Sequence, residues 1–214
     1  MVLTQGSRIA VIGAGISGIA AAAVLKKNGF LPVVFEKHDR IGGVWATASP
    51  GVHLQNIYTQ YHLSDFDWPF KPDLHPSGEQ IMRYLEAAVR HLKLDLRLGH
   101  QVLSMTEETD GWRLRYRNKE GVHEESFSYV LLAAGQYTDG KNLPSYMDQE
   151  LFKGDILTER DVTSLDVFEG KRVVVVGYGK SALDMTTLAA ERAAQVHHVF
   201  RAANWLIPEW ILGA

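Results

Sequence analysis

The 214-residue chain contains no cysteine, and this absence excludes disulfide bonds, thiolate-ligated metal sites and redox chemistry by a pair of thiols. No apolar run reaches the roughly 18 residues that a membrane-spanning helix requires. Residues 1–7 lack the pattern of a signal peptide, because an apolar strand pattern follows at once. The net charge of −3 favours neither nucleic acid nor an anionic membrane as a partner. We therefore expect a cytoplasmic protein that binds neither of them.

The nine histidines do not form a metal-binding pattern. No HExxH or comparable ligand spacing occurs, and the neighbours His197 and His198 would point to opposite faces of a strand. We therefore expect no metal cofactor. The chain does have material for a core, since 46% of its residues are hydrophobic and 22% are charged.

Two glycine-rich turns of the same kind are the most informative feature of the sequence. The first spans residues 13–18 (GAGISG) and directly follows an apolar run. A buried strand that enters a helix through such a turn presents the free N–H groups of the helix N-terminus to a pyrophosphate. Gly13 permits the turn, Gly15 lets the backbone approach phosphate, and Gly18 lets helix and strand pack closely. We expect a branched side chain at Gly15 to oppose both the ligand and the backbone conformation.

The segment after the first turn supports a dinucleotide site. An alanine-rich helix ending near residues 28–29 is followed by a second apolar strand, residues 33–35, which ends at Glu36. An acid at this place accepts hydrogen bonds from an adenosine ribose. The alternative is a Rossmann-like turn that holds no ligand.

The second turn, residues 177–182 (GYGKSA), follows the apolar run 173–176 and has Ala182 in place of the third glycine. Alanine still packs closely, so the motif is kept in its GxGxxA form. We expect a helix over about residues 181–192 and a strand over 196–200 that leads to Arg201. A guanidinium there attracts a ribose 2′-phosphate and favours NADP over NAD. The alternatives are that Arg201 is a solvated strand end and that Lys180 is solvated rather than close to the pyrophosphate.

Two such turns in one chain predict two dinucleotides, and the usual reason to hold two is the transfer of a hydride between them. On these motifs the chain resembles the flavin-containing monooxygenases, a family that joins an FAD domain to an inserted NADPH domain. Residues 41–45 (IGGVW) match the family's GGxW segment, and residues 131–137 (LLAAGQY) resemble the strand-and-glycine segment that closes its FAD lobe. Residues 152–154 (FKG) match the first half of its FxGxxxH signature. The resemblance covers essentially the whole chain.

The chain also departs from the family pattern. The histidine of FxGxxxH falls on Thr158, and the aromatic residue expected four positions later falls on Val162. This departure weakens the assignment to a subfamily more than the assignment of cofactors. Baeyer–Villiger monooxygenases share the glycine motifs and usually carry the same histidine.

The resemblance implies FAD and NADPH as cofactors and specific contacts for each. Contacts to FAD are expected from Gly13, Gly15, Ser17, Gly18, Glu36, Lys37, Gly43, Val44, Trp45, Val102, Ala134, Gly135 and Gln136. Contacts to NADPH are expected from Gly177, Gly179, Lys180, Ser181, Ala182 and Arg201.

The resemblance also implies a catalytic residue, Asn56. Amine- and sulfide-oxidising enzymes have Asn in the segment that aligns with residues 50–56, where Baeyer–Villiger enzymes tend to have Asp. By resemblance the amide of Asn56 lies over the flavin, and it can donate and accept hydrogen bonds without adding charge. Without the resemblance, an asparagine in a loop is more often a local turn former.

The implied reaction uses O2 and a small-molecule substrate. NADPH reduces FAD, O2 gives a C4a-hydroperoxyflavin, and an oxygen atom passes to an amine or a sulfide. The alternatives are a non-catalytic FAD-binding subunit or truncated remnant of such an enzyme, and a Baeyer–Villiger monooxygenase. The sequence does not identify the substrate or the oligomeric state.

The expected fold class is α/β. An FAD-binding, Rossmann-like domain of the glutathione-reductase type is predicted over residues 1–165, and the first βαβ unit of an NADPH domain over 170–214. A capping box at residues 77–80 begins a helix to about residue 93, and a strand is expected near 94–98. Three antiparallel strands near residues 102–107, 112–117 and 122–129 form a meander, and the aromatic loop 66–70 is expected to pack rather than to line a substrate tunnel.

The last ten residues, 205–214, are apolar apart from Glu209, and members of the family continue well past this point. Exposed, such a tail would promote aggregation. We expect a fragment, a truncated gene product or one subunit of a split enzyme, with a missing C-terminal half or a second subunit as the partner.

Overall fold

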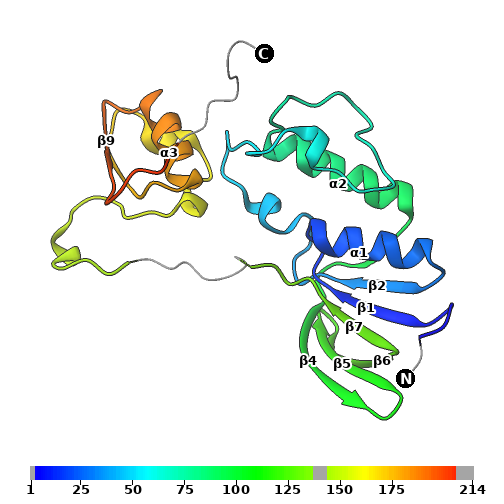
Figure 1. Cartoon of the computed structure of the whole chain (residues 1–214). Coiled ribbons are helices and arrows are strands. Elements are labelled where there is room, and N and C mark those ends of the chain that lie inside the picture. The colour runs from blue at the N-terminus through cyan, green and yellow to red at the C-terminus, as the bar shows by residue number, and fades with distance from the viewer. Residues whose placement is uncertain (1–2, 137–143, 206–214) are drawn as a thin grey trace. The chain divides into compact units, whose positions relative to one another are not determined.

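The computed structural model describes residues 3–136 and 144–205. Within these ranges the chain divides into two compact units, residues 3–48 with 56–136 and residues 49–55 with 144–205 (Figure 1). The boundary predicted after residue 165 therefore differs from this division. Ser49 Oγ donates a hydrogen bond to the carbonyl of Glu159, and Val52 packs against the apolar core that contains Val162. These contacts place residues 49–55 and 144–165 in the second unit.

The first unit contains a parallel sheet of four strands in the order β3-β2-β1-β7. These are β1 (Arg8–Ile12), β2 (Leu31–Phe35), β3 (Asp95–Arg97) and β7 (Tyr129–Leu132). The central strands are apolar and buried, as is usual for strands of parallel sheets. Ile12 pairs with both Phe35 and Leu132, so the carboxyl ends of three strands meet at one edge. A ligand site is expected at this edge in an open α/β sheet.

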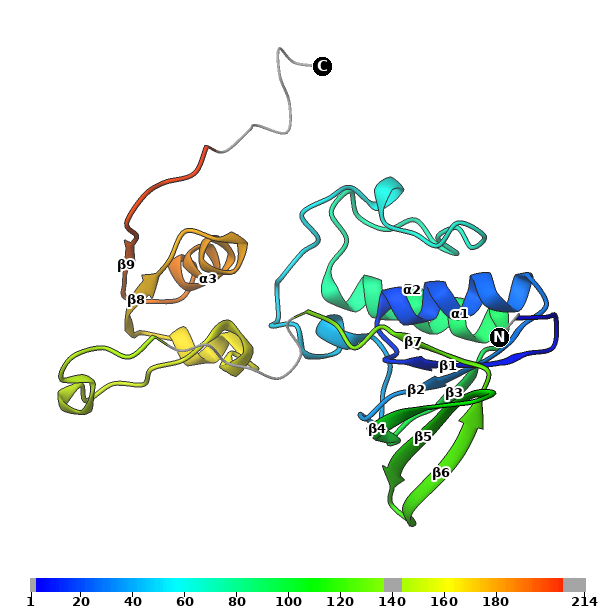
Figure 2. The same ribbon diagram turned by 60° about the horizontal axis from the view of Figure 1, so that its bottom comes forward.

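Helices α1 (Ile16–Lys27) and α2 (Gly78–Leu92) lie on one side of this sheet (Figures 1 and 2). The predicted capping box of α2 is confirmed, because Ser77 Oγ accepts from Gln80 N at 3.2 Å and Gln80 Oε1 accepts from Ser77 N at 3.1 Å. The helix buries Ile81, Leu85 and Ala88. It ends at residue 92, one residue before the predicted end.

Strands β4 (Gln101–Glu108), β5 (Gly111–Asn118) and β6 (Gly121–Phe127) form the predicted antiparallel meander, on the other side of the parallel sheet (Figures 1 and 2). The sequence placed residue 129 in the last of these strands, whereas the structure begins β7 there. Leu114 and Tyr116 face inward and pack with Phe35 of β2 and Phe127 in one core cluster. This apolar layer joins the meander to the sheet.

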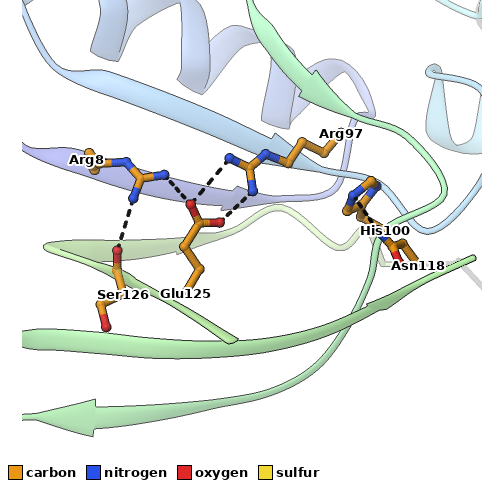
Figure 3. A network of polar contacts seen from close by, with 6 residues as sticks. All are labelled: Arg8, Arg97, His100, Asn118, Glu125 and Ser126. Atoms are coloured by element: carbon orange, nitrogen blue, oxygen red, sulfur yellow. Dashed lines mark hydrogen bonds and ion pairs between the residues drawn. The ribbon is translucent and has the colours of Figure 1, made fainter. Parts of the chain in front are cut away.

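Charged groups also join these two layers (Figure 3). Glu125 of β6 accepts hydrogen bonds from Arg8 of β1 at 2.6 Å and from Arg97 of β3 at 2.5 Å. Burial alone would raise the pKa of Glu125 and lower the pKa of Arg97. The hydrogen bonds and charges within this cluster outweigh burial, so the pKa of Glu125 lies below its ordinary value and that of Arg97 lies above it.

The second unit contains β8 (Arg172–Val176), α3 (Lys180–Ala190) and β9 (Gln195–Val199), with β8 and β9 parallel. Its core includes Phe168, Met185 and Ala189. The predicted βαβ pattern is confirmed, although helix and strand each begin one residue earlier than expected. Short 3-10 helices in the chain are Gly43–Thr47, Tyr58–Gln60, Gln149–Leu151, Glu159–Asp161 and Leu165–Phe168.

None of the helices in the described ranges is both long and apolar enough to cross a membrane.

Candidate functional site

The first glycine turn is packed tightly against the backbone of the parallel sheet. Gly13 has φ +107°, and a Cβ atom there would lie 2.3 Å from the carbonyl oxygen of Ala133. A Cβ atom at Gly18 would lie 1.9 Å from the carbonyl oxygen of Gly13. Real side chains cannot occupy either place. The structure thus gives Gly13 and Gly18 the structural roles that the motif predicts.

Gly15 differs from these two glycines. Its φ of −74° and ψ of 179° are open to any residue. A Cβ atom there would lie 3.7 Å from Gly43 Cα, which is an ordinary contact. The expectation that the backbone conformation resists a branched side chain at this position is therefore wrong. The glycine leaves open space at the N-terminus of α1, where no side chain caps the helix and the free N–H groups favour an anion.

Glu36 is buried, with 7% of its surface exposed, and its carboxylate is bonded to the first turn. Oε2 accepts from the backbone N–H of Ala14 at 2.8 Å, and Oε1 accepts from that of His38 at 3.0 Å. Sequence reasoning gave Glu36 only a ribose contact and missed this bond. Each carboxylate oxygen can accept a further hydrogen bond, so both roles are compatible.

The GGxW segment lies against the first turn. The N–H of Gly42 donates to the carbonyl of Ala14 at 2.8 Å, and a Cβ atom at Gly43 would lie 3.1 Å from Gly15 Cα. Trp45 Nε1 donates to the hydroxyl of Tyr61 at 2.7 Å. Burial raises the pKa of Tyr61, and this bond opposes only part of the shift. Tyr61, which the sequence did not single out, thus holds Trp45 beside the site.

The remaining residues predicted for FAD occupy several places. Ala134, Gly135 and Gln136 are exposed and follow β7, at the sheet edge that carries the turn. Val102 instead packs against the core cluster around Phe35. The structure also places Ser17, Lys37 and Val44 at exposed positions, in or directly after the elements that form the turn.

The second glycine turn repeats the hydrogen bond of the first. Gly13 N–H donates to Phe35 O at 2.8 Å, and Gly177 N–H donates to Val199 O at 2.9 Å. Val199 therefore corresponds to Phe35, and the residue after it, Phe200, corresponds to Glu36. The interpretation that Arg201 stands in the place of the acid is wrong by one residue, because β9 ends at Val199. Arg201 occupies the next place, and it makes no ion pair or hydrogen bond with the described parts of the chain.

The middle glycine of the second turn also leaves open space. Gly179 has φ −82°, and no atom lies within 4 Å of the place that its Cβ would occupy. Gly177 has φ +126°, and Ala182 Cβ would lie 3.5 Å from its Cβ. Ser181 is exposed, and Lys180 forms an ion pair with Asp184 one helical turn later. The positive charge of Lys180 is thus paired with a carboxylate of the same helix.

Asn56 is exposed, and its Nδ2 donates a long hydrogen bond of 3.4 Å to Gln60 Oε1. Within the described residues it makes no hydrogen bond to either turn. Most of the hydrogen-bonding capacity of its amide is therefore available.

The residues where the chain departs from FxGxxxH have structural roles. Thr158 is the N-cap of a short helix, where its N–H and hydroxyl both donate to Asp161 at 2.8 Å. Val162 is 4% exposed and belongs to the core of the second unit.

The aromatic loop packs, as expected. Phe66 and Trp68 lie on the ring of Tyr84, with centroids 5.6 and 4.4 Å away, and the guanidinium of Arg83 lies 4.2 Å from the ring centre of Phe70. A hollow of about 430 Å³ lies beside Trp68 and Phe70. Trp205, the first residue of the apolar tail, is 98% exposed, and residues 206–214 lie outside the described residues, as does Tyr137.

Comparison with known proteins decides the family. The family model described as flavin-binding monooxygenase-like matches residues 6–211. The chain belongs to this family. Flavin-containing monooxygenase 5 of Oryctolagus cuniculus is 32% identical over 222 residues, which cover 94% of this chain and 41% of that protein. Flavin-binding monooxygenase-like proteins of this kind are oxidoreductases.

Solved structures agree with the family. A steroid monooxygenase bound to NADP is 29% identical, with a TM-score of 0.78 over 95% of this chain and 40% of its own. A flavin-containing monooxygenase from Stenotrophomonas maltophilia has a TM-score of 0.82 at 21% identity, over 96% of this chain and 61% of its own. The predicted α/β fold and the predicted cofactors, FAD and NADPH, agree with these relatives. The chain spans about half the length of the curated relatives it matches.

Proposed function

We propose that the chain is the cofactor-binding portion of an FAD- and NADPH-dependent monooxygenase that oxygenates an amine or a sulfide. The observation that carries this proposal is shared by the two turns. Each has a middle glycine, Gly15 or Gly179, that neither its backbone conformation nor its packing requires. The space that each leaves open lies at the N-terminus of a helix, where a pyrophosphate binds.

In this proposal the first turn binds FAD and the second binds NADPH. The N-terminus of α1 holds the FAD pyrophosphate, and Glu36 accepts a hydrogen bond from the adenosine ribose while it keeps its bond to Ala14. Arg201 is free of partners among the described residues and binds the 2′-phosphate of NADPH. When bound, the flavin accepts hydride and activates O2. Asn56 orients the reacting groups with an uncharged amide that both donates and accepts.

The catalytic activity is that of the full-length or reassembled enzyme, with a C-terminal half or a second subunit as the proposed partner. A non-catalytic FAD-binding subunit is the alternative. Purified protein that is yellow and oxidises NADPH supports the first proposal, and yellow protein that leaves NADPH unchanged supports the alternative. Protein without flavin contradicts both.

A pair of variants tests the assignment of the two turns. Gly15→Ala should fold, because its Cβ meets only an ordinary contact, and should lose bound FAD. Gly179→Ala should keep FAD and lose affinity for NADPH. Each variant is the control for the other, and the measurements are the flavin-to-protein ratio and NADPH titration calorimetry. A normal flavin ratio in Gly15→Ala removes the first turn from the FAD site.

A further variant tests the type of oxygenation. Asn56→Asp places a carboxylate where we propose that the amide faces the flavin. In the full-length enzyme we expect FAD binding to persist and more hydrogen peroxide to be released per NADPH oxidised. Unchanged coupling would remove Asn56 from the active site. Conversion of ketones to esters by the unmodified enzyme would instead support Baeyer–Villiger chemistry.

A further inference from the structure

His198 of β9 makes contacts that no motif assigns. Its neighbour His197 is exposed, whereas His198 is partly buried and its Nε2 lies 2.5 Å from the carbonyl oxygen of Gly177 in the second turn. The imidazole stacks on the ring of Tyr178, with a centroid distance of 5.5 Å and an interplanar angle of 11°. Phe200 contacts both rings, at 5.1 Å from His198 and 4.4 Å from Tyr178. The second turn is therefore held by three aromatic rings.

The hydrogen bond to Gly177 determines how the turn is oriented. A carbonyl oxygen only accepts, so Nε2 of His198 carries the proton and donates. The N–H of Gly177 donates to Val199 O at 2.9 Å, so both backbone groups of this glycine are bonded to β9. No described peptide bond is cis, and in a trans peptide the N–H points opposite to the preceding C=O. The N–H of Tyr178 thus points away from His198, and it donates to no group in the described parts of the chain.

In the first turn, the corresponding peptide is held in a different way. The N–H that corresponds to Tyr178 is that of Ala14, and the carboxylate of Glu36 holds it directly. Phe200 occupies the place of Glu36 and cannot accept a hydrogen bond. In the second turn the peptide is therefore fixed from its carbonyl side. Without that bond, the flexible Gly177, at φ +126°, could let the peptide rotate and turn a carbonyl dipole toward a bound phosphate.

We propose that His198 is a positioning residue for the second nucleotide site. It holds the carbonyl of Gly177 against β9, so that this dipole does not turn toward the bound nucleotide. This inference rests on the proposed function, in which the second turn binds NADPH. Because His198 acts on the turn and not on the 2′-phosphate, its loss weakens NADPH and NADH equally.

Three variants of the 214-residue chain test the proposal by calorimetric titration with NADPH and with NADH. His198→Ala should weaken both nucleotides about tenfold, which corresponds to one lost hydrogen bond of about 1.4 kcal/mol. His198→Gln should recover most of this affinity, because its side-chain amide can donate from the place of Nε2. His197→Ala, on the opposite face of the same strand, should leave both affinities unchanged. The flavin-to-protein ratio of the first turn should be normal in all three.

The outcomes separate this inference from the proposed function. A wild-type chain that binds neither nucleotide overturns both the second site and the role of His198. A wild-type chain that binds NADPH, with His198→Ala equal to His197→Ala, overturns the positioning role alone. Equal losses in His198→Ala and His198→Gln also overturn it, because they would show that the ring matters through packing and not through its hydrogen bond.

Discussion

The two glycine turns share one backbone hydrogen bond but have different surroundings. In the first turn, Cβ atoms added at Gly13 and Gly18 would lie only 2.3 and 1.9 Å from backbone oxygens. The buried carboxylate of Glu36 accepts a hydrogen bond from this turn. In the second turn a Cβ at Gly177 would meet only Ala182 Cβ at 3.5 Å, and aromatic rings surround the turn. The third glycine of the motif thus distinguishes a closely packed turn from an open one, while the middle glycine is open in both.

The largest effect on stability should come from a substitution at the third glycine position of the motif, which is Gly18 in the first turn and Ala182 in the second. Gly18→Ala forces a Cβ onto the carbonyl oxygen of Gly13, so the turn must move. We expect a loss of bound FAD and about 3 kcal/mol of unfolding free energy, measured by urea titration and flavin content. The reciprocal Ala182→Gly should cost only about 0.5–1 kcal/mol. Similar costs for both changes would contradict the difference in packing.

The variant Arg201→Ala should show whether the second turn and its flanking residues bind the 2′-phosphate of NADPH. A charge-assisted hydrogen bond is worth about 1.5–3 kcal/mol, so NADPH should bind roughly 10- to 100-fold more weakly. NADH, which lacks the 2′-phosphate, should hardly change. This asymmetry, measured by calorimetry, distinguishes Arg201 from His198. Equal losses for the two nucleotides would mean that Arg201 is structural.

The variant Glu36→Gln should destabilise the first turn, by less free energy than Gly18→Ala. The carboxylate accepts from two backbone N–H groups on two oxygens, whereas glutamine offers one oxygen and would turn an NH2 group toward the other donor. We expect a loss of about 1–2 kcal/mol in urea unfolding of the flavin-free protein. The exposed Glu107 of β4 provides the control, because Glu107→Gln should change stability little. No loss in Glu36→Gln would show that the bond to Ala14 does not stabilise the turn.

The smallest effect concerns pH and the layer behind the first turn. The folded state holds the pKa of Glu125 below that of an ordinary glutamate, which is about 4.3. The stabilisation is therefore present above that value and is lost as the pH falls through the lowered pKa of the folded protein. Urea unfolding from about pH 7 to pH 3 should show stability falling with acid, less steeply in Glu125→Gln. An equally steep slope in Glu125→Gln would contradict the prediction.

Much of the fold follows from short-range patterns in the sequence. Apolar runs predicted β1, β2 and β8, and the capping box at Ser77 placed the start of α2, because these signals depend on neighbouring residues. The division of the chain could not be predicted, because residues 49–55 join the second unit through contacts with residues far away in the sequence. The same holds for the bond from Glu36 to Ala14. A one-residue error in the end of β9 was enough to put Arg201 where Phe200 stands.

The contact between Gly13 and Ala133 has a consequence for the order in which the protein can form during synthesis. The closed turn begins near the N-terminus, but the strand that completes its surroundings, β7, is translated only after the whole meander. Emerging chains that end before Ala133 lack this side of the first turn. The contacts of the second turn come from residues 172–204, which are translated one directly after another. Contacts between distant residues form later than local ones. The first turn, although it is closest to the N-terminus, therefore acquires its complete surroundings only after β7 has been translated.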